Sequence, residues 1–220
     1  MKTSRSTVLL LAGALAVAPS VAFSADDAHW YASVNAGGNF MPDQSLSSTG
    51  AGPGQTGEVD LGAGFSSGAA VGRAFNRNLR AEAEFLYQST NHDGSRLNNG
   101  VSLPDGNFAS TAFALNGIYS FNLFGRETVR SYVGVGVARL TEVDIDFEQG
   151  GREMSFSGDD WAVQFLLGAR YELGKRWFLD AGLRHLNAGE VTMEGEGATV
   201  GRVRADYQPW SATLGVGIRF

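Results

Sequence analysis

The side chains that could do chemistry in this 220-residue chain are few. His185 could act as a general base, but Asn187, two positions later, cannot supply a nucleophile. His29 and His92 have no ligand-like partners nearby in the sequence, and the chain has no cysteine. We therefore expect no catalytic, cofactor-binding or metal-binding residues: the protein is predicted not to be an enzyme and to need no cofactor.

Ionic side chains recur at alternate positions of strand-like segments, where a two-residue period places them on one face. The set is Arg80, Glu82, Glu84, Arg170, Asp180, Arg184 and Arg219. Glycine and serine fill most of the remaining positions on the same faces. Four arginines and three carboxylates nearly balance, and buried charges are tolerated only when paired. We expect these residues to form a buried charge network.

Eight stretches with this period must position that network. They are about Trp30–Phe40, Asp60–Phe75, Leu79–Gln88, Ala109–Phe121, Val129–Thr141, Trp161–Glu172, Trp177–Leu186 and Tyr207–Phe220. The connectors between them alternate, with short turns at 76–78, 123–127 and 174–176 and long loops at 41–57, 91–107, 142–158 and 188–203. An even strand number with short turns at one end and long loops at the other is typical of outer-membrane barrels. The sequence predicts an all-β fold, an eight-stranded antiparallel up-and-down transmembrane β-barrel.

The direction in which each face points separates a membrane barrel from a soluble one. A soluble barrel buries its apolar face, whereas glycine-rich strands make a weak solvent-facing surface and suit a narrow interior. We therefore place the apolar faces toward lipid and the charges in the lumen. A soluble periplasmic barrel that binds a small ligand is the alternative.

Aromatic residues agree with the membrane orientation. They lie on the apolar faces and gather near strand ends, where rings prefer the membrane interface. The predicted girdle comprises Trp30, Trp161, Trp177, Trp210 and Tyr171.

The N-terminus has the pattern of a signal peptide. Lys2 and Arg5 precede the apolar run Val8–Ala18, and small residues precede a cleavage point after Ser24. The apolar run is too short to span a bilayer as a helix. We expect residues 1–24 to be removed and residues 25–220 to form the barrel domain. The net charge of −6, with no basic run, argues against nucleic-acid binding.

Two hairpins are predicted to continue beyond the membrane. Val143, Ile145 and Phe147 alternate with acidic residues before a turn, and Gly189–Met193 is similar. Protruding strands could offer free edges to a partner strand, or the segments could be solvated loops. Their acidic residues could also hold divalent cations that bridge lipopolysaccharide phosphates.

Several stretches resemble the family of small outer-membrane barrels that includes OmpA-like and opacity-type porin-family proteins. They are Arg80–Tyr87, Tyr132–Ala138, Gly168–Leu173, Gly182–Asn187 and the terminal Gly215–Phe220. The resemblance implies a plugged lumen, export to the outer membrane of a Gram-negative bacterium, and Phe220 as an assembly signal read by the outer-membrane insertion machinery. It also implies contact with outer-membrane lipids and lipopolysaccharide, and roles in envelope integrity, adhesion or host interaction through an unknown surface ligand.

One stretch bears on an enzymatic alternative. Arg184–Gly189 is superficially similar to the His-x-Ser region of lipid A deacylases, but Asn187 stands where the serine is required. The resemblance to those enzymes therefore lacks its nucleophile.

Overall fold

The computed structural model describes residues 28–41, 44–49, 55–97, 102–103, 106–123, 125–126, 128–149, 152–195 and 201–220. Residues 1–24, predicted to be a signal peptide, lie outside the described residues. Within the described ranges, no helix has the length and apolar character needed to cross a membrane.

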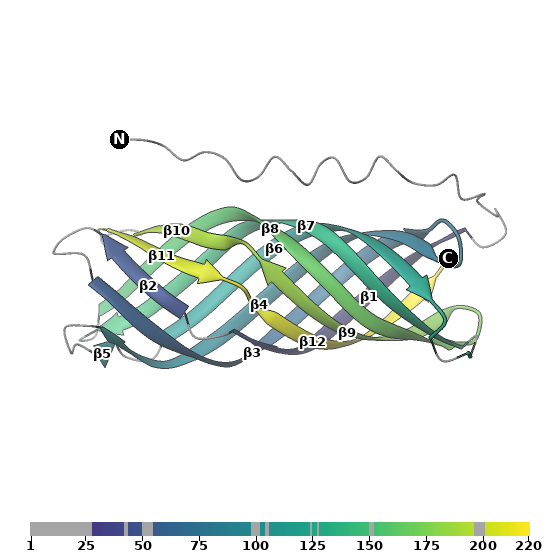
Figure 1. Cartoon of the computed structure of the whole chain (residues 1–220), viewed down its shortest axis with the longest axis horizontal. Helices are drawn as coiled ribbons and strands as arrows, with labels where there is room; N and C mark the ends of the chain where they lie inside the picture. Colours follow the sequence, from purple (N-terminus) through teal and green to yellow (C-terminus); the bar gives the residue numbers. More distant parts are fainter. Residues whose placement is uncertain are drawn as a thin grey trace.

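Twelve strands are present in the described residues (Figure 1). They are β1 (His29–Phe40), β2 (Gln44–Thr49), β3 (Gln55–Ala74), β4 (Leu79–Leu97), β5 (Ser102–Leu103), β6 (Gly106–Phe121), β7 (Val129–Gln149), β8 (Arg152–Leu173), β9 (Trp177–Asn187), β10 (Gly189–Gly195), β11 (Arg202–Tyr207) and β12 (Trp210–Arg219).

Eight of these strands close a barrel. Going around the wall, the antiparallel order is β1, β3, β4, β6, β7, β8, β9 and β12, and β12 pairs back with β1. Closure gives every strand in this ring two hydrogen-bonded neighbours, so no free edge remains at this level. The predicted eight-stranded antiparallel barrel is confirmed.

The wall continues past this ring at the long-loop end (Figure 1). Here β10, β11 and β2 take the places of β9, β12 and β1, between β8 and β3. The two predicted hairpins are confirmed, since Val143–Phe147 lies in β7 and Gly189–Met193 in β10. The rest of the segments predicted as loops at 41–57, 91–107, 142–158 and 188–203 also contains strands, which is a correction. We call the part of the barrel above the Trp161–Trp210 level the extension.

The prediction that the protruding strands could offer free edges to a partner is wrong as well. β7 pairs with β8 as far as Gln149 and Arg152, and β10 pairs with β11 from Gly189 to Glu194. The chain uses these edges to complete its own wall. One edge of β8 is an exception to this continuous pairing. Its pairing with β9 ends at Val163, and its pairing with β10 begins only at Ser157.

Irregularities cluster at the base of the extension. Pro209, which has no N–H to donate, separates β11 from β12, and Gly189 with φ 69° starts β10. β7 also shifts register against β8 between Leu140 and Val143. These breaks mark the level at which the wall changes its chemistry.

Below that level the outer wall is apolar. Its exposed large side chains include Val34, Phe85, Phe113, Leu115, Val135, Phe165, Leu179 and Leu214. Many inward residues of the same strands are polar or small, as the sequence predicts, and Ser66, Gln88, Asn116 and Gln164 are buried. Larger apolar side chains, among them Leu86, Ile118 and Phe178, are buried beside them. This arrangement is inside-out relative to a soluble barrel.

Above that level the polarity reverses. The outward residues of β10 and β11 are Glu190, Thr192, Glu194, Arg202, Arg204 and Asp206, and all six are exposed. The inward residues Val191, Met193, Val203, Ala205 and Tyr207 are buried in an apolar cluster with Leu140, Val143 and Phe156. A wall that is polar outside and apolar inside is the arrangement expected in water.

The height of the apolar band fits a membrane. Trp161 and Tyr171 lie ten residues apart on β8, on the same outer face. At about 3.3 Å per residue and a strand tilt of about 40°, they are separated by about 25 Å along the barrel axis, which matches the usual apolar band of transmembrane barrels. Arg152 starts the strand nine residues above Trp161, which extends the wall by about 20 Å.

A charge on the apolar band should cost stability. Leu214 is 72% exposed in the middle of β12. We expect Leu214→Arg to lower the free energy of unfolding by about 2–4 kcal/mol, because the guanidinium must enter the hydrocarbon region. The measurement is urea-induced unfolding in lipid vesicles. Thr192→Arg, on the outer wall of the extension, should cost less than about 1 kcal/mol, and equal costs at both positions would contradict the assignment of the band.

Candidate functional site

The lumen contains a layer of ion pairs in its central part. Arg184 on β9 donates to Glu84 on β4 at 2.5 Å across the barrel. Glu84 also accepts a hydrogen bond from the Asn116 amide at 3.0 Å, and Gln164 donates to Asn116. Both charged side chains are under 10% exposed. The strands on opposite sides of the barrel are thereby tied together through its centre.

A second cluster lies one layer closer to the short turns. Arg170 donates to Asp180 at 3.1 Å and lies 3.8 Å from Glu82, which also pairs with Arg80 at 3.2 Å. The predicted lumen residues Arg80, Glu82, Glu84, Arg170, Asp180 and Arg184 are therefore all brought together inside the barrel. They carry three positive and three negative charges, so the layers are neutral.

Aromatic side chains fill the space around these ions. Tyr31 donates to Glu82 and Tyr132 donates to Asp180, each at 2.5 Å. The Arg170 guanidinium lies 3.8 Å from the centre of the Phe178 ring, which supports the cation electrostatically. Gly217 faces that ring, and a Cβ there would come within 2.1 Å of it, so glycine is required.

Little open space remains in this layer. The cavity between the ion pairs has a volume of about 50 Å³, room for very few water molecules. The lumen is therefore plugged by its own side chains, as expected for eight strands.

Arg219 lies at the edge of this network. Its guanidinium is 5.6 Å from the centre of the Phe178 ring that Arg170 also contacts. Its ion-pair partner is Glu172, at the mouth of the barrel near the short turns, and Glu172 was not predicted as a charge partner.

A belt of neutral hydrogen bonds separates the charged layers from the apolar cluster. Gln88 donates to Ser211 at 2.5 Å, and the Tyr207 hydroxyl lies 2.5 Å from the Ser110 hydroxyl. Complete burial raises the pKa of the Tyr207 phenol well above its usual range, so it remains protonated. Its ring stacks on Phe108 at 5.2 Å and so begins the apolar layer.

The sequence pattern places Tyr31 and Tyr132 on the polar, lumen-facing sides of their strands, but their hydrogen bonds to the ions and the position of Phe178 were not predicted. The sequence does indicate where these rings point. Along each strand, each ring alternates with the lipid-facing side chains and so lies on the glycine-rich face. Such rings, placed opposite glycines on a neighbouring strand, indicate that the glycines make room for them.

The predicted girdle residues are all exposed on the outer wall. Trp161 and Trp210 lie at the base of the extension, and Trp30, Trp177 and Tyr171 lie near the short turns. Phe220 follows β12 with its ring 73% exposed, and its backbone pairs with Trp30.

His185 lies among these rings. Its imidazole stacks on Trp210 with centroids 4.4 Å apart, and Trp210 stacks in turn on Phe40. Asn187 is exposed at the end of β9. In the part of the chain that the structure describes, no group of His, Asp or Glu side chains is placed to hold a metal ion.

The fold and the lumen together define a class: a closed eight-stranded barrel with an apolar outer band and an internal plug. The family of the outer membrane protein beta-barrel domain matches residues 7–220. The chain belongs to this family.

Solved structures share the fold at low sequence identity. OprG from Pseudomonas aeruginosa is 17% identical with a TM-score of 0.63, covering 88% of this chain and 97% of OprG. Neisserial surface protein A is 18% identical with a TM-score of 0.52, covering 88% and 99%. A curated relative, outer membrane protein AlkL from Ectopseudomonas oleovorans, is 38% identical over 69 residues. That match spans 31% of this chain and 28% of AlkL.

The family sets the orientation of the barrel. In outer-membrane barrels the short turns lie in the periplasm and the long loops outside the cell. The ion pairs therefore lie toward the periplasm, and the extension projects from the outer surface.

Breaking the central ion pair should be costly. Glu84→Gln leaves the Arg184 guanidinium buried without its carboxylate, so we expect a loss of about 3–5 kcal/mol in the free energy of unfolding. Urea unfolding in vesicles measures it. Glu194→Gln is the matched control, because its pair with Arg202 is more than 60% exposed and should contribute under about 1 kcal/mol. Similar losses in the two variants would show that the plug does not carry the stability assigned to it.

Proposed function

We propose that this protein is a non-enzymatic outer-membrane barrel that conducts no sizeable current and carries its surface loops on a stiff extension above the membrane. The reversal of wall polarity at the level of Trp161 and Trp210 is the observation that carries the proposal. Glu190, Arg204 and Asp206 are exposed on the outer wall of the extension. Charged side chains are too costly to expose to hydrocarbon, so this part of the wall does not face lipid. The extension is therefore assigned to the aqueous phase outside the cell.

The extension has the properties of a rigid support. β7 and β8 have 21 and 22 residues and remain paired over their whole protruding length. Its interior is packed with apolar side chains, among them Leu140, Val143 and Met193, which are fully buried. Such a support would hold the loop tips about 20 Å beyond the girdle. This supports a role in surface recognition, adhesion or envelope integrity.

That the loops bind a surface ligand stays a prediction. The tips at 50–54, 98–101, 150–151 and 196–200 lie outside the described residues. Contacts with lipopolysaccharide, with the insertion machinery through Phe220 and with a host ligand are likewise proposals that follow from the family.

The non-enzymatic assignment is supported by the surroundings of His185. A general base needs an orienting partner and a nucleophile within hydrogen-bond reach. Here the ring packs against Trp210 and the nearby Asn187 is not a nucleophile. The lipid A deacylase alternative would require both missing groups.

Single cysteines should report the position of the extension, because the natural chain has none. In intact cells, a large membrane-impermeant maleimide should label Thr192→Cys. It should label Arg126→Cys, in a periplasmic turn, only after the outer membrane is permeabilised. Leu115→Cys, on the apolar band, should stay unlabelled in both cases. Protection of Thr192→Cys in intact cells would contradict the proposed extension.

The plugged lumen should prevent large conductance. In planar bilayers we expect no steady open-channel current, because the cavity of about 50 Å³ in the ion-pair layer is too small for a water column to pass through that layer. A general porin reconstituted in the same way controls for insertion. Long-lived openings of porin-like size would overturn the non-conducting assignment.

A further inference from the structure

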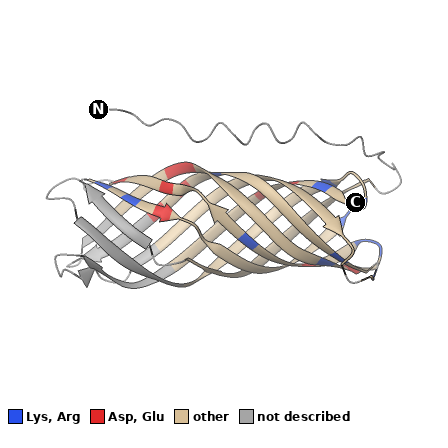
Figure 2. Ribbon diagram, viewed as in Figure 1, with Lys and Arg blue, Asp and Glu red and all other residues tan. Residues whose placement is uncertain are grey.

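Basic side chains gather at the periplasmic rim of the barrel. Figure 2 shows blue segments at the end that carries the C-terminus. The exposed residues are Arg73, Arg77, Arg126, Lys175 and Arg176, and each of the three periplasmic turns contributes at least one. Among the described residues of this end, no acidic side chain is exposed.

The opposite side of the membrane has the opposite balance. Among the described side chains, the outward-facing ionic residues of the extension are the acids Glu142, Asp144, Asp159, Glu190, Glu194 and Asp206 and the bases Arg139, Arg202 and Arg204. Six negative and three positive charges give −3, and all three arginines are paired with acids. Of these two surfaces, as far as their side chains are described, the periplasmic rim is the one with excess positive charge.

Three of the basic residues lie close together on one side of the rim. Arg73 at the end of β3 pairs with Trp30 of β1, and its guanidinium lies 5.4 Å from the centre of that ring. Trp30 pairs with Phe220, and the neighbouring Arg219 donates its N–H to the Arg176 carbonyl. Arg73 and Arg176 are thus three strand spacings apart, about 14 Å. Lys175 precedes Arg176 in the same turn.

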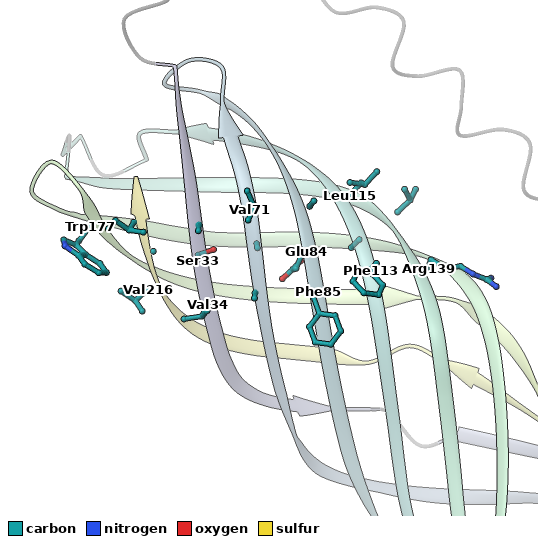
Figure 3. A pocket seen from close by; sticks show the side chains of 18 of the residues that line it. Ser33, Val34, Val71, Glu84, Phe85, Phe113, Leu115, Arg139, Trp177 and Val216 are labelled. Carbon is teal, nitrogen blue, oxygen red and sulfur yellow. The ribbon is translucent and has the colours of Figure 1, made fainter. Parts of the chain in front are cut away.

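An apolar groove, with Trp177, Val71, Phe85 and Phe113 among its lining residues, lies on the outer wall (Figure 3). Its volume is about 820 Å³. Small side chains at Ala32, Ala69 and Ala83 and the rings of Phe85 and Phe113 line it, and Arg139 and Trp161 line its end near the extension. Its periplasmic end is lined by Trp177, which directly follows Arg176, and by Val71, two residues before Arg73.

We propose that this groove and the cations Arg73, Lys175 and Arg176 bind an anionic phospholipid of the periplasmic leaflet. The acyl chains lie in the groove, and the phosphate lies between the basic side chains at the depth of Trp30 and Trp177. Among the described residues of this rim the one acid near these cations, Glu172, is paired with Arg219, so the charge of Arg73, Lys175 and Arg176 is in excess. Cations at a membrane surface attract anionic headgroups, and the attraction falls with salt.

Tryptophan quenching in bilayer discs tests the lipid preference. In a Trp161→Phe, Trp210→Phe background, only Trp30 and Trp177 remain as reporters, both at the periplasmic end. Brominated phosphatidylglycerol is compared with brominated phosphatidylcholine. At low salt we expect phosphatidylglycerol to be preferred by about threefold or more, and at 1 M salt the ratio should fall close to one.

Two sets of substitutions locate the site. Arg73→Gln with Lys175→Gln and Arg176→Gln should abolish the preference at low salt. Arg202→Gln with Arg204→Gln removes positive charges from the extension, at positions that do not line the groove, and should leave the preference unchanged. Heat-dependent gel mobility checks that each variant remains a folded barrel.

The other two tryptophans test whether the lipid preference is confined to the periplasmic end of the barrel. In a Trp30→Phe, Trp177→Phe background, quenching of Trp161 and Trp210 should show no preference for phosphatidylglycerol. Equal quenching by both lipids at Trp30 and Trp177 at low salt would overturn the proposal. A preference that survives the Arg73, Lys175 and Arg176 substitutions, or that is equal at both ends, would overturn it as well.

Discussion

The demand that every backbone N–H and C=O inside a membrane be paired within the protein governs this structure. In hydrocarbon there is no water to satisfy an open edge, so the sheet must close on itself. Closure with eight strands leaves an interior only wide enough for side chains. Those side chains must complement one another, and here they do so through neutral sets of ions, tyrosine hydroxyls and amides.

The same demand explains the two chemistries of the wall. Where lipid surrounds the barrel, apolar side chains face outward and the ions of Arg184 and Glu84 lie inside. Where water surrounds it, Glu190 and Arg204 face outward and Val191 and Val203 lie inside. The hydrogen-bonded strands pass through both zones, and only the side chains change: the polar and apolar faces of the wall exchange sides. Pro209 and Gly189 lie at this transition, where the wall is least regular.

Much of the membrane-embedded part could be predicted because its signal is local. Alternation along one strand, as at Arg80, Glu82 and Glu84, fixes which face is polar without knowledge of any partner. The extension could be predicted only in part. Local alternation at Val143–Phe147 and Gly189–Met193 predicted protruding strands but not their partners, because β10 and β11 pair with β8 and β2 from distant parts of the sequence. The partner of Arg219 was missed for a similar reason, since its height at the rim depends on the stagger between β12 and its neighbours.

The reversal of polarity along a single strand is the central claim, and a nitroxide scan of β8 tests it most directly. Spin labels placed one at a time at the outward positions 157, 159, 161, 163, 165, 167, 169 and 171, in lipid vesicles, report collisions with oxygen, which dissolves in lipid, and with a water-soluble nickel complex. We predict that oxygen dominates within the band between Trp161 and Tyr171 and the nickel complex dominates at 157 and 159. Oxygen-dominated collisions that continue unchanged through 159 and 157 would place the extension in the membrane and contradict the account.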